Sequence, residues 1–147
     1  MKKLFPIVML LILGFAACTP GEGSKFAGKY SGTFTFVRDN YTKDGTVLIT
    51  NNPLSTNGIL MYACLPLEET TPNVYEANSE NVEYMATILE SMTGGNNYID
   101  SATEQVKNIK VKATFTDNKL DLTVAYEVQI LGIATTEIRI IEFTGTK

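Results

Sequence analysis

The 147-residue sequence contains no histidine, no tryptophan and only two cysteines. Because histidine is absent, Ser-His-Asp and Cys-His nucleophile systems are excluded, and so are the usual zinc sites. Acidic residues outnumber basic residues by 16 to 12, and no basic cluster occurs outside the first few residues. A nucleic-acid-binding protein needs a concentrated positive surface, so this class is excluded as well. The sequence therefore indicates a non-enzymatic protein without a cofactor.

Carboxylate chemistry is the remaining catalytic alternative, since two acids are enough for glycoside hydrolysis. Candidate acids lie in segments that read as loops, but no spacing selects a pair among them. These acids are Glu68, Glu69, Asp100 and Glu104. The acidic segment 39–45 lacks the closing glutamate of a calcium loop, so no metal site is predicted.

What the chain does have is a strongly apolar beginning. Lys2 and Lys3 precede an apolar segment from Leu4 to Ala17, which ends in small residues. This segment is shorter than the roughly 20 residues that a membrane-spanning helix needs. Its order of charge, apolar run and small residues is that of a secretory signal peptide, which we place at residues 1–17.

Cys18 follows the pair Ala16-Ala17 directly, an arrangement that resembles a bacterial lipobox. The resemblance implies that Cys18 is lipidated after the signal is removed, which would anchor the protein to a membrane. Residues 18–24, polar and rich in glycine, read as the lipidated cysteine with its flexible tether. The expected location is the cell envelope, at the outer membrane, with its periplasmic or surface face left open. The alternative is an ordinary signal peptide followed by an incidental cysteine.

Residues 25–147 form a chain of the size of one domain. If Cys18 carries lipid, Cys64 has no partner for a disulfide. Cys64 lies in an apolar run, where a free cysteine behaves as a small buried hydrophobe rather than a reactive thiol.

Hydrophobicity alternates with a period of two over most of this domain, which is typical of β-strands with one buried face. Odd positions are apolar from Ile109 to Phe115, and even positions are apolar from Leu120 to Ile130. Asp117-Asn118 between the two runs is suited to a tight turn. A two-residue turn there pairs apolar residues with apolar residues throughout, so the sequence predicts a β-hairpin in this register.

Shorter strands are predicted earlier in the chain, over Tyr30–Phe36, Thr46–Thr50 and Ile59–Leu65, with a loop over Pro66–Asn78. In the last strand, near Thr136–Thr144, the apolar positions change from even to odd, which predicts a β-bulge. One segment, at about residues 79–93, has apolar residues at helical spacing and is followed by Gly94-Gly95. It predicts one inserted amphipathic helix.

Three stretches resemble the calycin-like, lipocalin-like lipoprotein domains that are abundant in Bacteroidetes. They are Gly28–Phe34, with its Gly-x-Tyr-x-Gly opening, Asp117–Leu122, and the ending Ile141–Lys147. The resemblance implies a mainly β fold, a small antiparallel barrel or strongly curved sheet, in families that mostly lack an assigned activity. It implies no catalytic residue.

Two functional hypotheses follow. In the first, the protein is a binding module that holds a small apolar ligand inside the barrel, lined by aromatic residues and methionines. The predicted lining residues are Tyr30, Phe34, Phe36, Met85, Met92 and Tyr126. The same residues could instead fill a solid core. In the second hypothesis, the protein is a structural or interaction protein that docks an envelope protein or a glycan, for which exposed Tyr41, Tyr75 and Tyr98 would supply contact area.

Overall fold

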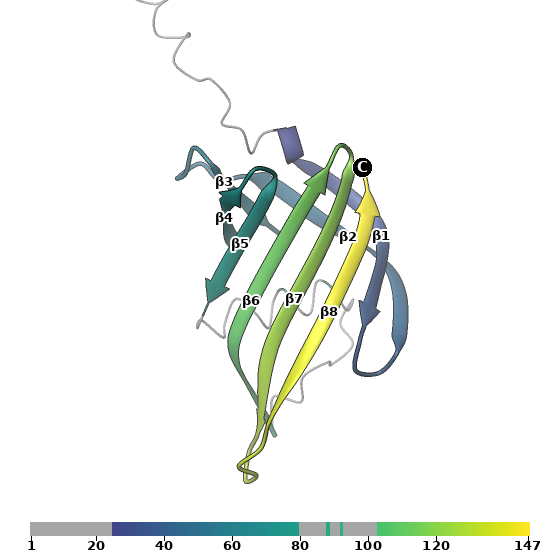
Figure 1. Cartoon of the computed structure of the whole chain (residues 1–147), viewed down its shortest axis with the longest axis vertical. Helices are drawn as coiled ribbons and strands as arrows, with labels where there is room; N and C mark the ends of the chain where they lie inside the picture. Colours follow the sequence, from purple (N-terminus) through teal and green to yellow (C-terminus); the bar gives the residue numbers. More distant parts are fainter. Residues whose placement is uncertain (1–24, 80–87, 89–91, 93–102) are drawn as a thin grey trace, which may run out of the picture.

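The computed structural model describes residues 25–79, 88, 92 and 103–147. Within these residues the chain forms eight antiparallel strands, each paired with the next, and β8 pairs with β1 to close the ring (Figure 1). The strands are β1 (Gly28–Phe36), β2 (Tyr41–Asn51), β3 (Gly58–Met61), β4 (Leu65–Thr71), β5 (Val74–Ser79), β6 (Glu104–Thr116), β7 (Lys119–Ile130) and β8 (Thr136–Thr146). The prediction of a mainly β, antiparallel fold is confirmed, and the strand connectivity is that of a closed barrel.

Several predicted features lie outside the described residues. They include the signal peptide at 1–17, Cys18 with its tether, Met85 and Tyr98. Within the range of the predicted helix, the structure describes Ile88 and Met92, which are both buried, and Ser79, which ends β5. The inserted helix therefore stays a prediction. Among the described residues, no helix is long and apolar enough to cross a bilayer.

The β6–β7 hairpin has the register that the sequence predicts. Thr116 pairs with Lys119, and farther from the turn Val111 pairs with Val124. In the turn, Asp117 takes a φ of 52°, in the left-handed region that short polar side chains tolerate. A slip of one residue would turn every inward side chain of one strand outward, so the turn and the apolar pattern specify the same register.

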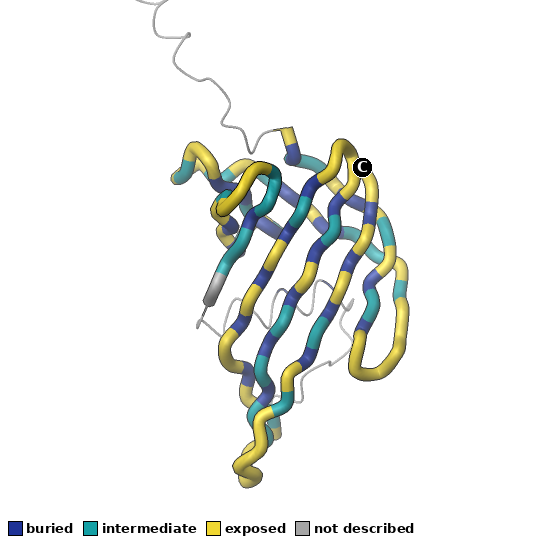
Figure 2. Tube along the Cα trace, viewed as in Figure 1, coloured by how far each residue is buried: buried dark blue, intermediate teal, exposed yellow. Residues whose placement is uncertain are grey.

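Side chains alternate between the interior and solvent along β6, β7 and β8, as Figure 2 shows by its alternating colours. The even positions of β7 from Leu120 to Val128 are all buried, with exposed fractions of 2% or less. They join a single core with inward-facing residues of the other strands. These partners include Tyr30, Phe34, Phe36, Val47, Ile49, Ile59, Met61, Leu67, Tyr75, Val111, Phe115, Ile141 and Phe143.

Three glycines lie side by side where the ring closes. Gly32 of β1 pairs with Gly45 of β2 on one side and with Gly145 of β8 on the other. A Cβ atom at Gly45 would lie 2.6 Å from the Phe34 ring, and one at Gly145 would lie 2.4 Å from the Phe143 ring. The two rings contact each other with centroids 4.6 Å apart. The glycines therefore leave the space that these two aromatic side chains fill.

The chain from Ile59 to Asn78 differs from the prediction. The sequence predicts one strand followed by a loop, whereas the structure contains β3, β4 and β5. Tyr62 and Ala63 form the turn between β3 and β4, with φ values of 51° and 59°. Residues of these types rarely adopt such angles, so nothing in the sequence signals the turn. The Tyr62 hydroxyl donates a hydrogen bond to the Thr46 carbonyl oxygen at 2.7 Å, which fixes the turn against β2.

The prediction of a bulge in the last strand is wrong. β8 pairs with β7 and with β1 without a shift in register. Instead, Ile138 and Ile140 point away from the core, with Ile138 66% exposed, and Arg139 occupies the inward position. Among the described strands, register shifts lie instead in β4, between Glu69 and Thr71, and in β6, between Lys107 and Lys110. An arginine facing the interior is what makes the apolar pattern of β8 appear to change parity.

One end of the ring carries a cluster of aromatic rings, which we call the aromatic end: Phe26, Tyr30, Tyr75 and Phe115. Phe26 stacks on Phe115 with centroids 4.3 Å apart, and Tyr75 meets both rings edge-on. The Tyr30 hydroxyl donates to the Phe26 carbonyl oxygen at 2.9 Å. Because Tyr75 packs against Phe26 and Phe115, its side chain is fully buried, so the prediction that Tyr75 is exposed is wrong. Tyr41 is 47% exposed, as predicted.

We predict that Val124→Ala lowers the free energy of unfolding by at least about 1 kcal/mol, because it removes buried methyl groups from the centre of the core. Chemical denaturation monitored by circular dichroism would measure the change. Thr123→Ala, at the exposed neighbouring position, is the matched control and should change stability by no more than about 0.5 kcal/mol. Equal effects of the two substitutions would contradict the inward orientation of the even positions of β7.

Candidate functional site

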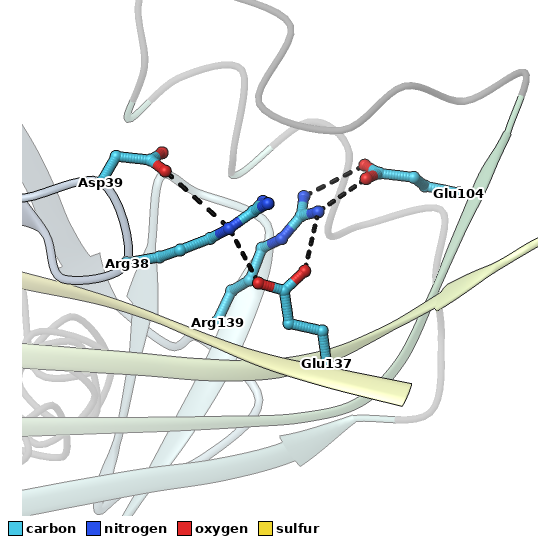
Figure 3. A network of polar contacts seen from close by, with 5 residues as sticks. All are labelled: Arg38, Asp39, Glu104, Glu137 and Arg139. Atoms are coloured by element: carbon cyan, nitrogen blue, oxygen red, sulfur yellow. Dashed lines mark hydrogen bonds and ion pairs between the residues drawn. The ribbon is translucent and has the colours of Figure 1, made fainter. Parts of the chain in front are cut away.

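The end of the ring opposite the aromatic end holds a network of five charged residues, which we call the charged end: Arg38, Asp39, Glu104, Glu137 and Arg139 (Figure 3). Arg139 lies at its centre. Its Nη1 and Nη2 atoms donate to the two carboxylate oxygens of Glu104 at 3.0 and 2.6 Å. Nη2 also donates to Glu137 at 3.3 Å, and the other oxygen of Glu137 lies 2.8 Å from Nε of Arg38. Arg38 further lies 3.8 Å from Asp39.

The strand geometry explains why an arginine lies inside. Arg139 belongs to the same inward-facing row of β8 as Ile141 and Phe143, and its side chain is only 4% exposed. Glu104 is the first residue of β6, and β7 separates β6 from β8. The ion pair therefore crosses the inner face of β7, where Glu104 is itself 15% exposed.

Such a buried guanidinium needs a partner, because an uncompensated charge in a protein interior costs several kcal/mol. The two-pronged contact with Glu104 supplies both charge and hydrogen-bond geometry. Hydrogen bonding to Glu104 is the main cause that raises the pKa of Arg139 above its ordinary value. Arg139 therefore stays charged, and its positive charge is balanced within the network.

The five described residues of the network together carry one excess negative charge. It contains two guanidinium groups, on Arg38 and Arg139, and three carboxylates, on Asp39, Glu104 and Glu137. Arg139, the innermost group, is held by two of these carboxylates. Among these five residues carboxylates outnumber guanidinium groups, so an added anion would increase an existing excess of negative charge.

Tyr126 lies directly beside this network on the inner face of β7. It pairs with Arg139 in the β7–β8 register, and its side chain is 1% exposed. Its hydroxyl has no hydrogen-bond partner in the part of the chain that the structure describes. Burial raises the pKa of Tyr126 to about 12, so the hydroxyl stays protonated. The charged end therefore contains a buried, neutral hydroxyl group, that of Tyr126, which donates no hydrogen bond to any described residue.

The predicted lining residues divide between the two ends. Tyr30 belongs to the aromatic end, and Phe34 packs on Phe143 near the three glycines. Phe36 pairs with Ile141 of β8 and is buried, and so is Tyr126. Met92 is buried too, with 2% exposure. The structure thus places the described members of the set inside the ring, but it does not gather them into one site.

Sequence reasoning missed Arg139 and its partner Glu137, and it placed Glu104 in a loop. The signal for Arg139 was present: the odd positions 139, 141 and 143 form one row in β8. A charged residue in such a row reads as outward-facing unless its partner is known. That partner, Glu104, lies 35 residues earlier, so only the tertiary structure brings the two together.

The acids considered for catalysis have structural partners. Glu104 is bound to Arg139, Glu68 accepts a hydrogen bond from Ser55 at 2.8 Å, and Glu69 accepts one from the Asn73 backbone at 2.8 Å. Asp100 lies outside the described residues. The glycosidase alternative gains no support from these contacts.

Cys64 lies in the β3–β4 connection, half-buried against the core. Its thiol contacts the Met61 carbonyl oxygen at 3.8 Å, and burial raises its pKa. A raised pKa lowers the fraction of reactive thiolate, which agrees with the interpretation of Cys64 as a small apolar side chain.

The outer wall has an open hollow of about 380 Å³ over β5, β6 and β7. Glu76, Lys110, Lys112 and Thr123 line it, and Lys112 lies 3.9 Å from Glu76. Because it is open and lined by exposed side chains, it does not enclose a ligand as the interior of the ring would.

No protein-family model, curated protein or solved structure matches this chain.

The contrast between two buried tyrosines gives a prediction. Tyr126→Phe should leave the free energy of unfolding unchanged or raise it, because it removes a buried hydroxyl without a partner. Tyr30→Phe, the matched control, should lower it by about 1 kcal/mol, because it deletes the hydrogen bond to Phe26. Urea denaturation of both variants would measure the difference. A loss of stability in Tyr126→Phe as large as that in Tyr30→Phe would show that the Tyr126 hydroxyl is already satisfied.

Proposed function

We propose that this protein is a lipid-anchored, non-enzymatic binding module of the cell envelope, with a lipocalin-like, calycin-like barrel that holds a small apolar ligand. The observation that carries the proposal is the closed ring, whose inward-facing side chains are apolar and aromatic except at the charged end. Closed antiparallel rings of about eight strands are large enough to hold one small ligand. The resemblance of the Gly28–Phe34 opening to lipocalin-like lipoproteins supports the same function.

The two ends of the ring differ in how they are filled, and this difference supports entry of the ligand at the charged end. At the aromatic end, Phe26 packs between other rings, and Nζ of Lys147 donates to the backbone oxygens of Lys25 and Ala27 at 2.7 and 3.2 Å. These contacts hold residues 25–27 across that end. The charged end has polar groups that can be solvated, and we propose that the ligand enters there.

Lipidation at Cys18 would orient the ring relative to the membrane. The chain joins the ring at the aromatic end, and Lys25 follows Cys18 by seven positions. A fully extended stretch of that length spans at most about 25 Å. The anchor would therefore hold the aromatic end toward the membrane, and the charged end could face away from it.

Native mass spectrometry of the protein extracted from the membranes of its own host tests the binding function. We expect a population that carries one small apolar molecule, which dissociates when the protein unfolds. Protein that carries neither a small molecule nor a partner would contradict the proposal. Identification of the released molecule would give the ligand class directly.

Cys18→Ser tests the anchor. We predict that the variant moves from the membrane fraction to the soluble fraction with an unchanged circular dichroism spectrum, because no core residue lies before Phe26 among those described. Fractionation and immunoblotting would measure the shift, with Cys64→Ser as the control that should stay in the membrane fraction. Retention of Cys18→Ser in the membrane would refute lipid anchoring through this residue.

A second candidate function is docking of an envelope protein or a glycan through the outer surface. It is favoured by apolar side chains exposed beside the charged end: Leu131 and Ile133 are 58% and 53% exposed in the β7–β8 turn, and Ile138 is 66% exposed. Exposed apolar groups that lie close together commonly mark contact sites. Tyr41 is also exposed, as this alternative requires. The same mass spectrometry experiment distinguishes it, since a bound protein or glycan would replace the small molecule.

A further inference from the structure

The Tyr126 hydroxyl is one feature of the interior that packing alone does not explain. Its side chain is 1% exposed, and its oxygen has no hydrogen-bond partner among the described residues. More than nine in ten buried polar groups in proteins have a partner, because leaving one unpaired costs about 1–3 kcal/mol. A phenylalanine would fill the same space without this penalty. The unpaired hydroxyl therefore points to a molecule that the ring binds.

The position of this hydroxyl limits where that molecule lies. Tyr126 faces inward between Val124 and Val128 on β7, and both of these valines are fully buried. Arg139 is its direct neighbour on β8. A ligand that reaches the hydroxyl thus has apolar side chains along its body and the charged network beside its head group.

The charges at this end select the kind of head group. The guanidinium of Arg139 is held by both oxygens of Glu104 and by Glu137, and the five described residues of the network together carry one excess negative charge. A carboxylate entering this low-dielectric region would lose its hydration and face two carboxylates already bound to Arg139. A neutral head group pays a smaller desolvation penalty and can use the tyrosine hydroxyl as donor or acceptor.

We propose that the interior at the charged end binds an uncharged amphiphile, with an alkyl or ring body among the apolar side chains and an alcohol or ester head group hydrogen-bonded to the Tyr126 hydroxyl. This inference rests on the proposed binding function and adds the class of ligand. Tyr126 is the residue that recognises the head group through a hydrogen bond. The charged network disfavours the binding of anionic head groups.

A competition experiment tests the selection. The full chain carrying Cys18→Ser, which needs no detergent, is incubated in buffer with equal concentrations of 1-hexadecanol and hexadecanoic acid, which differ only in the head group. Native mass spectrometry then measures the ratio of the two bound forms at a pH at which the acid is ionised. We expect the alcohol to exceed the acid by at least about tenfold, because the acid must bring an uncompensated charge into the interior.

Tyr126→Phe should lower the bound fraction of the alcohol about fivefold to tenfold, because it removes one hydrogen bond while keeping the ring. Tyr41→Phe, which changes an exposed tyrosine, is the matched control and should leave binding unchanged. The predicted stability of Tyr126→Phe means that its loss of binding would not reflect unfolding.

The possible outcomes distinguish failure of the neutral-ligand inference from failure of the proposed binding function. If both compounds bind equally, or if Tyr126→Phe binds the alcohol as well as the unchanged protein does, the neutral-ligand inference is wrong while the binding function stands. The hydroxyl would then be satisfied by water. If neither compound binds, and N-phenyl-1-naphthylamine, a neutral apolar probe, does not bind either, then the proposed binding function and this inference are both overturned.

Discussion

Closure of the sheet between β1 and β8 is the constraint on which the rest of this structure depends. Because every strand has two neighbours, alternate side chains of each strand must share one interior. The three paired glycines, Gly45, Gly32 and Gly145, lie at this closing seam. They leave room for Phe34 and Phe143, whose contact joins the core across the β1–β8 boundary.

Closure also gives Arg139 its unusual environment. In an open sheet with one solvated face, an arginine within an apolar row could reach water at an edge. In the ring, the inward row of β8 leads only to the interior, so the charge must be met by another inward side chain. Glu104 provides it from β6, across the inner face of β7. Buried ion pairs contribute little net stability compared with apolar side chains of similar size, so this pair is better understood through the polarity that it gives the charged end.

The two ends of the ring therefore have different chemistry. The aromatic end is filled by stacked and edge-on rings around Phe26, with the Tyr30 hydroxyl satisfied by a backbone oxygen. The charged end has paired charges beside the buried Tyr126 hydroxyl. The interior is therefore apolar toward the aromatic end and polar at the charged end. An interior of that kind matches an amphiphile better than a uniformly apolar molecule.

The sequence by itself determined the mainly β class, the register of the β6–β7 hairpin and the inward-facing residues of β7. The reason is that hydrophobic alternation, as in residues 120–128, and turn chemistry are local properties of the chain. It did not determine the β3–β4 turn at Tyr62-Ala63, whose left-handed angles are imposed by contacts with β2. It also could not place the Arg139 side chain in the interior, or place the Tyr126 hydroxyl beside Arg139 with no hydrogen-bond partner among the described residues. Those depend on Glu104 and on the closing of the ring, and contacts between residues far apart in the chain exist only once the fold has brought them together.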